Sequence, residues 1–371
     1  MKMDNNVLVT AGYFQGDSIL EEDIINITDS NIPFERMENK TVFITGATGL
    51  IGSQIVRTLL YCRESRGIDI KVIAYVRDAE KAKRVFGEFC SHSGLTIYCG
   101  DIRDDLLIPY PIDYIIHGAS VTGSKDFINI PVDTIKTAVT GSIKLLELAK
   151  TKKTDSMVFL SSLEVYGVTD RGKKYIREED YGYLDPLNVR SSYSESKRMV
   201  ECLCASYVKQ YGVPVKIARL SQTFGAGVGY HDNRVFAEFA RCILEKKDIL
   251  LHTRGETVRN YCYTRDAVKA ILLILLKGKN GEAYNTANQS TAISIRDMAQ
   301  MLSELYPEAG IKVVYELGNA QALGYNPDVK IELDTSKLNA LGWKAEVGLL
   351  EMYRRMLQSM SDRQTSELQN K

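Results

Sequence analysis

Short apolar runs rich in β-branched residues alternate with amphipathic segments along most of the chain. Six runs have the length and composition of buried strands, at 41–45, 71–76, 95–99, 114–119, 157–162 and 215–220. Apolar residues at helical spacing predict helices at 50–63, 79–92, 130–150, 192–211, 234–246, 266–277 and 295–306. Near-continuous apolar strands separated by helices are typical of a parallel sheet covered on both faces. The pattern therefore predicts an α/β protein with a doubly wound parallel sheet, the Rossmann arrangement.

The alternation does not extend over the whole chain, and this divides it into four segments. Residues 1–38 are polar and mixed, with an acidic run at 21–23 and isoleucines after it. We expect an N-terminal arm there, with a short helix packed on the body or on a partner subunit. Residues 39–222 form the doubly wound domain. After it the alternation loosens, which predicts a smaller lobe over 223–357, with segments that return to the core, and a polar tail over 358–371.

Composition limits the class of protein. Of the 371 residues, 44% are hydrophobic and 25% are charged, as in ordinary globular proteins. The 47 basic and 47 acidic residues cancel, which argues against a nucleic-acid or membrane partner. The longest apolar run, at 270–276, is too short to span a bilayer, and the N-terminus lacks the pattern of a signal peptide. The 7 cysteines show no framework or metal-binding spacing, so we expect reduced thiols, no metal site and a cytoplasmic location.

A glycine-rich loop joins the first predicted strand to the first predicted helix. Glycines allow a tight turn and a close approach of the backbone to a pyrophosphate, whose charge then faces the helix N-terminus. The strand before and the helix after are the context that such a motif requires, so we expect NAD or NADP to bind here. The alternative is a glycine-rich turn without a ligand. The residues expected to contact the cofactor are Gly46, Thr48, Gly49, Leu50, Ile51 and Gly52.

The ends of the next strands carry further candidate cofactor contacts. An acidic residue after the second strand would bind the adenosine ribose and favour NAD, whereas a basic residue would accept a 2′-phosphate. Arg77 occupies that place, with Asp78 one residue later, so the sequence favours NADP over NAD and leaves both open. Arg77 as a plain surface residue is the alternative. Asp101 and Ile102 follow the third strand, where the carboxylate of Asp101 is placed to meet the adenine amino group. Gly118, Ala119 and Ser120 follow the fourth strand and are small, as needed where the backbone passes the cofactor.

Tyr193 and Lys197 begin the predicted helix 192–211. Residues four apart project from one face of a helix, and a neighbouring ammonium lowers the pKa of a phenol by favouring the phenolate. Such a tyrosine is a general base for an alcohol that gives up a hydride to a nicotinamide. Ser162, at the end of the fifth predicted strand, would hydrogen-bond the reacting oxygen. The alternative is structural, with Ser162 in a turn and Tyr193 beside a helix cap.

Several segments match motifs that occur together in one family: TGATGLIG (45–52), GDIRD (100–104), HGAS (117–120), SSLEVYG (161–167), YSESK (193–197), ARLSQTFG (218–225), RNYCYTRDA (259–267) and TSKLNALGW (335–343). From about Lys40 to Leu357 the chain resembles the extended short-chain dehydrogenase/reductase family, in its branch of nucleotide-sugar epimerases, dehydratases and decarboxylases. The resemblance implies a sugar-nucleotide substrate that is oxidised at C4 of the sugar by Ser162, Tyr193 and Lys197.

The resemblance also implies substrate contacts and an assembly. Arg259 is expected to clamp the substrate pyrophosphate, with Arg234 as a second contact, since each guanidinium can bond two oxygens. The asparagine usual in the R-x-x-N-x-x-G stretch of the family is Gln222 here, a longer amide that changes the substrate contact. Helices 130–150 and 192–211 would form a homodimer through a four-helix contact.

Glu164, two residues after Ser162, bears on the reaction. Once C4 is a ketone, a carboxylate on C5 belongs to a β-keto acid that readily loses CO2, and a nearby carboxyl group would act as acid or base or position water. The resembled dehydratases carry Asp-Glu where this chain has Leu163-Glu164, whereas UDP-glucuronate decarboxylases carry a small residue followed by Glu. We therefore expect decarboxylation of a UDP-glucuronate-like substrate.

Other functions stay open at this point. They are a dTDP-, CDP- or GDP-sugar 4,6-dehydratase, a C4 epimerase or reductase, and a regulatory subunit that binds the cofactor without catalysis. A separate alternative is that Glu164 is a structural hydrogen-bonding residue. The intact set of Ser162, Tyr193 and Lys197 argues against the regulatory subunit.

Overall fold

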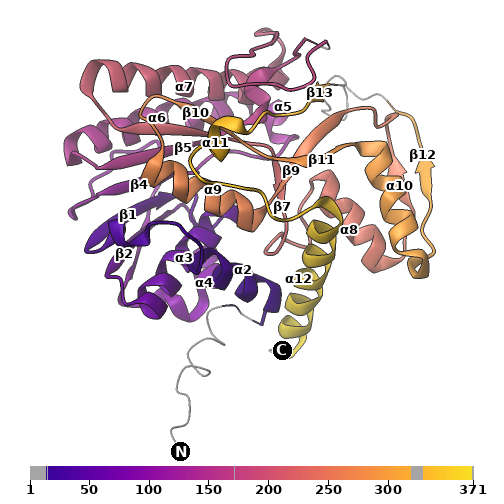
Figure 1. The fold of residues 1–371 in the computed structure, drawn as a ribbon, viewed down its shortest axis with the longest axis horizontal. Helices are drawn as coiled ribbons and strands as arrows, with labels where there is room; N and C mark the ends of the chain where they lie inside the picture. The colour runs from indigo at the N-terminus through magenta and orange to yellow at the C-terminus, as the bar shows by residue number, and fades with distance from the viewer. Residues whose placement is uncertain (1–13, 15, 171, 319–328, 370–371) are drawn as a thin grey trace, which may run out of the picture.

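A seven-stranded parallel sheet in the order β10-β6-β5-β4-β1-β2-β3 forms the centre of the molecule (Figure 1). This computed structural model describes residue 14 and residues 16–170, 172–318 and 329–369. The strands are β1 (Lys40–Thr45), β2 (Ile70–Val76), β3 (Leu95–Cys99), β4 (Tyr114–His117), β5 (Ser156–Ser162), β6 (Val215–Leu220) and β10 (Ala283–Thr286). The strand order reverses between β1 and β4, where ligands of such sheets bind. The predicted doubly wound fold is confirmed.

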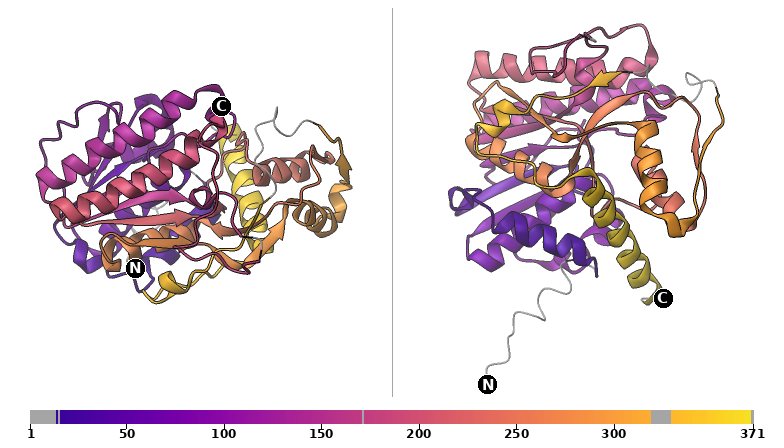
Figure 2. Two further views of the ribbon diagram at one scale, coloured as in Figure 1. Left: turned by 90° about the horizontal axis from the view of Figure 1, so that it is seen from above. Right: turned by 45° about the vertical axis from the view of Figure 1, so that its right-hand side comes forward.

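Helices cover both faces of this sheet, as the views in Figure 2 show. One layer contains α3 (Leu50–Arg66), α4 (Ala79–Phe86) and α9 (Thr264–Lys277), and the other contains α6 (Pro131–Lys152) and α7 (Ser192–Tyr211). Pro131 suits the first position of α6, because a backbone N–H at that position would have no acceptor within the helix, and proline has no N–H. Gly212 ends α7 in the left-handed conformation that glycine adopts without strain. Helix α9 is buried along nearly its whole length because the sheet lies on one side and α2 and α3 on the other.

A smaller lobe lies beyond the carboxyl ends of the strands, on the right of Figure 1. Its sheet contains β7 (Gln222–Phe224), β9 (Val258–Tyr263), β11 (Asn288–Ser294) and β13 (Lys330–Ile331), and β8 (Ile249–Leu251) pairs with β12 (Val313–Tyr315). The helices α8 (Val235–Glu245), α10 (Ile295–Leu305) and α12 (Leu349–Gln369) pack around a buried aromatic cluster. Short helices complete the chain: α5 (Asp126–Asn129), α11 (Ser336–Asn339), and the 3-10 turns Phe34–Met37, Gly87–Ser91, Leu163–Tyr166, Val189–Ser191 and Pro307–Ala309.

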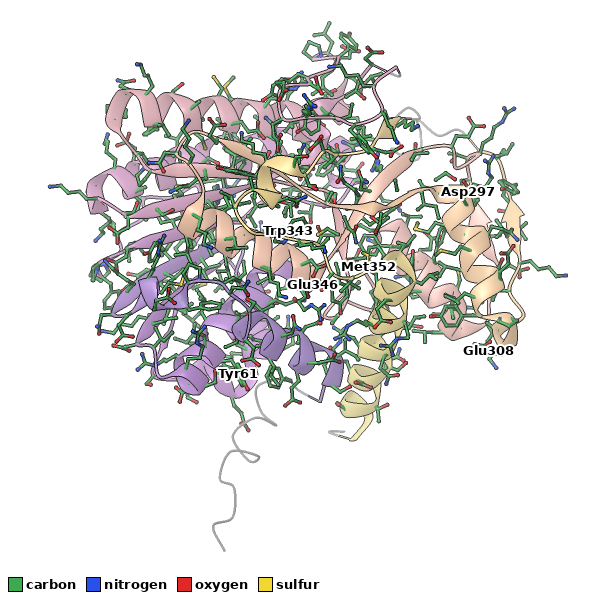
Figure 3. All side chains as sticks on the ribbon, viewed as in Figure 1. Tyr61, Asp297, Glu308, Trp343, Glu346 and Met352 are labelled. Atoms are coloured by element: carbon green, nitrogen blue, oxygen red, sulfur yellow. The ribbon has the colours of Figure 1, made fainter. Side chains whose placement is uncertain are left out.

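The segment after α11 returns to the doubly wound domain before α12 begins. Trp343 donates its indole N–H to the carbonyl of Asp266 at 2.9 Å, and Glu346 accepts a hydrogen bond from Lys269 at 2.9 Å. Figure 3 places Trp343 and Glu346 beside α9 and Met352 on α12. Residues 358–369, expected as a polar tail, instead continue α12 and bury Met360. No helix in the described ranges has the length and apolar character needed to cross a membrane.

The N-terminal arm contains the expected short helix, α2 (Ser18–Thr28), which packs on α3, α9 and α12 of the same chain. Asp23 of α2 is fully buried and accepts hydrogen bonds from Tyr263 at 2.5 Å, Arg355 at 2.8 Å and Arg265 at 3.5 Å. The expectation about a signal peptide rests mostly on residues 1–13, which lie outside the described residues.

We expect Asp23→Asn to lower the free energy of unfolding by about 3 kcal/mol, because it removes the buried carboxylate that faces two arginines. Denaturant unfolding followed by circular dichroism measures this loss. The matched control is Asp29→Asn at the exposed end of the same helix, where we expect a change within about 0.5 kcal/mol. Equal stability of the two variants would show that the buried ion cluster contributes nothing to the fold.

Candidate active site

Two glycines of the phosphate loop are required by close backbone contacts. Gly46 ends β1 with a φ of 67°, and a Cβ there would lie 2.6 Å from the carbonyl carbon of Gly118 at the end of β4. A Cβ on Gly52 would lie 2.3 Å from the carbonyl oxygen of Gly46. Gly49 is the N-cap of α3, and Leu50 begins the helix. The loop therefore holds the N-terminal amides of α3 at the point where the strand order reverses, which fits a dinucleotide pyrophosphate.

A buried hydrogen-bond chain supports the end of β4 beside this loop. Ala119 donates its N–H to Thr45 Oγ1 at 3.2 Å, and Thr45 Oγ1 lies 2.8 Å from His117 Nδ1. His117 Nε2 lies 2.9 Å from Ser142 Oγ, which donates to the carbonyl of Ala138. Since that serine proton is already used, His117 donates from Nε2 and accepts at Nδ1. Burial lowers the pKa of His117 to about 3, so the imidazole is neutral, and each hydrogen bond of this series has a fixed donor and acceptor.

The side chains expected near the adenosine end are differently engaged. Arg77 is exposed at the end of β2, whereas Asp78 accepts the N–H of Lys81 at 2.9 Å and caps α4. The carboxylate of Asp101, which was expected to meet the adenine amino group, is already paired with Arg103 Nη2 at 2.7 Å. In the same region Ile102 turns its side chain toward Gly141 of α6, and Ser120 donates to the carbonyl of Val121.

Ser162 and Tyr193 meet at the carboxyl end of β5. The Ser162 side chain lies close enough to Tyr193 to lower the pKa of the phenol, and Ser162 Oγ accepts the N–H of Glu164 at 3.2 Å. The ring of Tyr193 stacks on Phe127 with centroids 4.4 Å apart. Lys197 Nζ lies 5.5 Å from the centroid of the Tyr193 ring. The three residues that were expected to carry the oxidation are therefore brought together.

The expectation about the pKa of Tyr193 is wrong for the protein without bound cofactor. Burial of the phenol raises its pKa, and the negative charge of Glu164 raises it further. Lys197 is directed elsewhere, because Nζ donates to the carbonyl of Leu160 at 2.8 Å. Burial lowers the pKa of Lys197 to about 8. Ionisation of Tyr193 is therefore favoured by positive charge near the phenol, to which Arg190 and Arg234 already contribute.

Glu164 is held by two partners that the sequence did not indicate. Arg190 Nη1 and Nη2 donate to the two carboxylate oxygens at 3.1 Å each, and Ser194 Oγ donates to Oε2 at 3.0 Å. Burial acts to raise the pKa of Glu164, but Arg190 and the more distant charge of Arg259 outweigh it, and the pKa is lowered. A fork of this kind fixes both the position and the ionised state of the carboxylate. Residue 163 is a buried leucine in the core beneath it.

The residues expected to bind substrate approach this cluster from the smaller lobe. Arg259 lies on β9 close enough for its charge to act on Glu164, and its Nε is buried without a hydrogen-bond partner among the described residues. Arg234, at the N-cap of α8, acts on the pKa of Tyr193 and is bonded by Asp232 at 2.6 Å. Gln222 begins β7, opposite Tyr261 of β9.

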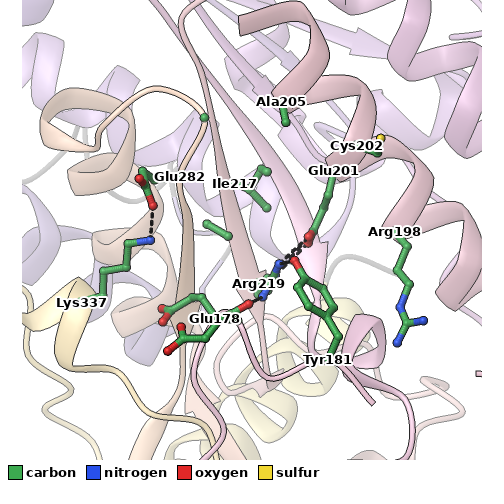
Figure 4. Close-up of a pocket in the computed structure, with 13 residues that line it drawn as sticks. Glu178, Tyr181, Arg198, Glu201, Cys202, Ala205, Ile217, Arg219, Glu282 and Lys337 are labelled. Carbon is green, nitrogen blue, oxygen red and sulfur yellow. Dashed lines mark hydrogen bonds and ion pairs between the residues drawn. The ribbon is translucent and has the colours of Figure 1, made fainter. Parts of the chain in front are cut away.

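A second ion pair supports the strand that carries Ser162. Ser161 Oγ donates to Glu201 Oε1 at 2.6 Å, and Arg219 Nη2 donates to Glu201 Oε2 at 2.6 Å. Arg219 Nη1 donates to the hydroxyl of Tyr166 at 2.8 Å. Figure 4 shows Arg219 and Glu201 at the wall of a pocket of about 510 Å³ between α7 and the edge strand β10. The pair joins β5, β6 and α7 behind the site.

A family model described as the NAD dependent epimerase/dehydratase family matches residues 42–287. The chain belongs to this family. Its relatives include UDP-glucuronic acid decarboxylase 1 of Xenopus tropicalis, 28% identical over 85% of this chain and 70% of that protein. UDP-glucuronic acid decarboxylase 6 of Arabidopsis thaliana is 28% identical over 84% of this chain and 86% of that protein.

Solved structures agree on the fold. A UDP-glucose 4-epimerase of Thermotoga maritima with UDP-glucose superposes with a TM-score of 0.73 at 23% identity, over 86% of this chain and 98% of that chain. A dTDP-glucose 4,6-dehydratase of Bacillus anthracis in complex with NAD gives 0.72 at 21% identity, over 88% and 98%. The resemblance found in the sequence motifs is confirmed, and the chain is a nucleotide-sugar-modifying enzyme of this family.

Arg190 and Ser194 are the site residues that the sequence analysis missed in this member of the family. Ser194 lies inside the YSESK segment, and Arg190 stands three residues before Tyr193 with its guanidinium 4.7 Å from the Phe127 ring centroid. The position of Arg190, a cation just before helix α7, was the only sign in the sequence of a partner for Glu164. The homodimer stays a prediction. Helices α6 and α7 pack side by side, and Val132 and Met199 are exposed on them. The mass of the particle in solution would test whether the chain forms a dimer.

Proposed function

We propose that this enzyme binds NAD(P), oxidises a UDP-glucuronate-like substrate at C4 and then decarboxylates it. The observation that carries the proposal is the state of Glu164, which Arg190 and Ser194 hold as a carboxylate beside Tyr193. The similarity to UDP-glucuronic acid decarboxylases agrees with it.

In the first half-reaction, Tyr193 takes the proton of the C4 hydroxyl while Ser162 hydrogen-bonds the same oxygen. NAD(P), held at the phosphate loop of Gly46, Gly49 and Gly52, would supply the acceptor for the hydride from C4 when bound. The pKa of Tyr193 is raised by burial and by Glu164 in the protein alone. The positive charge of an oxidised nicotinamide would oppose both effects, so the tyrosine becomes a base only when the site is loaded.

In the second half-reaction, the C5–carboxylate bond breaks and its electrons move to the C4 carbonyl oxygen. Tyr193 and Ser162 donate hydrogen bonds to that oxygen, and CO2 leaves without needing a proton. C5 then takes a proton. Glu164 Oε1 accepts a hydrogen bond only from Arg190 among the described residues, so a lone pair remains to hold the water that delivers this proton.

Elimination of water from the same ketone needs different groups. The departing C6 hydroxyl must be protonated, and a buried leucine at position 163 has no proton to give. Glu164 is also a poor acid, since Arg190 keeps its pKa low. A C4 epimerase needs no carboxylate at this position. The arrangement therefore favours decarboxylation over both.

The test is to mix the purified enzyme with UDP-glucuronate and follow the absorbance of reduced nicotinamide, then weigh the product by mass spectrometry. We expect transient absorbance and a product lighter by CO2. Loss of water from dTDP-glucose, with no reaction of UDP-glucuronate, would replace the proposal with dehydration. If no sugar nucleotide reduces the nicotinamide or is turned over, the protein would instead be a cofactor-binding regulatory subunit.

We also propose that the site accepts NADP as well as NAD, because Asp78 is engaged in capping α4 and Arg77 is exposed at the end of β2. Arg77→Ala should weaken NADP binding by about tenfold, the scale of one charge-assisted contact, and leave NAD binding almost unchanged. Calorimetric titration with each cofactor measures both constants. Arg84→Ala, at an exposed position on α4, is the control. Equal loss for both cofactors would remove Arg77 from the 2′-phosphate site.

A further inference from the structure

One hydroxyl group joins both terminal helices to the loop at 225–229, which follows β7. Ser359 of α12 donates Oγ–H to Oδ2 of Asp17 at 2.6 Å and accepts the N–H of Gly227 at 3.0 Å. Asp17 is the N-cap of α2, and both it and Ser359 have no exposed surface. The serine therefore uses its donor on one terminal helix and its acceptor on the loop.

Further contacts tie the same loop to the same two helices. Arg363 of α12 donates to the carbonyl of Gly227 at 3.4 Å and to that of Val228. Ala226 is buried in an apolar cluster with Leu20 and Ile24 of α2. Figure 1 and the right-hand view of Figure 2 show α2 and α12 side by side, and their contacts agree. We call this set of contacts the terminal clasp.

The loop rests on the first turns of α3, the helix that the phosphate loop opens. Gln54 Nε2 donates to the carbonyl of Ala226 at 2.7 Å. A Cβ on Gly227 would lie 3.4 Å from Cδ1 of Leu50, the first residue of α3. Gly227 has a φ of 84°, so its conformation is one that other residues adopt only with strain. A shift of the loop would therefore move the first turn of α3 and its N-terminal amides.

We propose that the terminal clasp sets the affinity of the enzyme for its dinucleotide, with Asp17 and Ser359 as positioning residues. Amides pointed at a pyrophosphate contribute most when they are held in place before binding, because ordering them costs part of the binding energy. The clasp provides that order from outside the segment matched by the family model, since α2 and α12 both lie beyond residues 42–287. The proposal rests on the proposed NAD(P) site.

Ser359→Ala tests this by cutting the link between Asp17 and Gly227. Titration of the full-length protein with NADH and with NADPH, followed by nicotinamide fluorescence, should give dissociation constants raised by a factor of about 2 to 30 for both. Arg363→Gln, a change at a partly exposed side chain that also contacts the loop, should act in the same direction. The control is Ser361→Ala on the same helix, whose hydroxyl makes no hydrogen bond to the described residues.

Thermal unfolding of each variant separates positioning from stability. A merely structural role would lower the melting temperature of Ser359→Ala and leave the dissociation constant of the folded protein unchanged, and this result overturns the inference. Unchanged binding by a folded Arg363→Gln variant would overturn it as well, even where Ser359→Ala fails to fold. If the wild-type protein binds neither NADH nor NADPH, the proposed cofactor site itself is wrong.

Discussion

Tyr193→Phe should slow the oxidation of UDP-glucuronate by about 10²- to 10⁴-fold, the usual contribution of a positioned general base. The variant keeps the ring that stacks on Phe127 and removes only the hydroxyl, which faces Ser162. Binding of cofactor and substrate should therefore change little. Single-turnover absorbance of reduced nicotinamide measures the oxidation directly, apart from the steps that follow it.

The control for this experiment is Tyr110→Phe, which removes the hydroxyl of a tyrosine that is 48% exposed. We expect it to oxidise substrate at the wild-type rate. Retention of more than about a tenth of that rate by Tyr193→Phe would contradict the assignment of the base, since the loss would fall below the range for general base catalysis.

Glu164→Gln should leave the oxidation in place and slow the second half-reaction by about 10²- to 10⁴-fold. The amide preserves the shape of the side chain, but it carries no negative charge and its N–H groups face the donors of Arg190, so it orients the water that protonates C5 poorly. Reduced nicotinamide should therefore accumulate instead of passing through a transient. Product mass and absorbance, recorded in one reaction, separate the two half-reactions.

Glu164→Gln should also shift the pH dependence of the oxidation rate toward acid. Glu164 raises the pKa of Tyr193, after the larger effect of burial, so removing the charge lowers that pKa. The base form of Tyr193 then becomes available at lower pH, and the rising limb of the oxidation rate shifts toward acid. Glu179→Gln, at an exposed position, should leave the profile unchanged. Normal product formation by Glu164→Gln would overturn its role.

The central sheet could be predicted because its strands are buried on both faces and read as apolar runs. Strand β10 (Ala283–Thr286) was missed because four residues of mixed character give no period. Helix α12 was missed for another reason. Its buried positions Met352, Met356 and Met360 recur at helical spacing, but the many charged residues between them lowered the apolar content of the segment.

The catalytic set could be predicted because strand ends and helix spacing are both local features of a sequence. Ser162 ends a strand, and Tyr193 and Lys197 share one helix face. The pairing of Glu164 with Arg190 could not be predicted, since it joins two short 3-10 turns that lie 26 residues apart and have no periodic pattern. The pKa of Tyr193 was predicted in the wrong direction because burial and the charge of Glu164 are properties of the folded site alone.

Release of labelled CO2 is the direct measurement of decarboxylation by this enzyme. The enzyme would be given UDP-glucuronate labelled in its carboxyl carbon, and the gas above the reaction would be collected and analysed. We expect label to appear as CO2 in step with loss of substrate, and Tyr193→Phe to release almost none. Consumption of substrate with the label retained in the product would contradict decarboxylation, whatever else the enzyme does to the sugar.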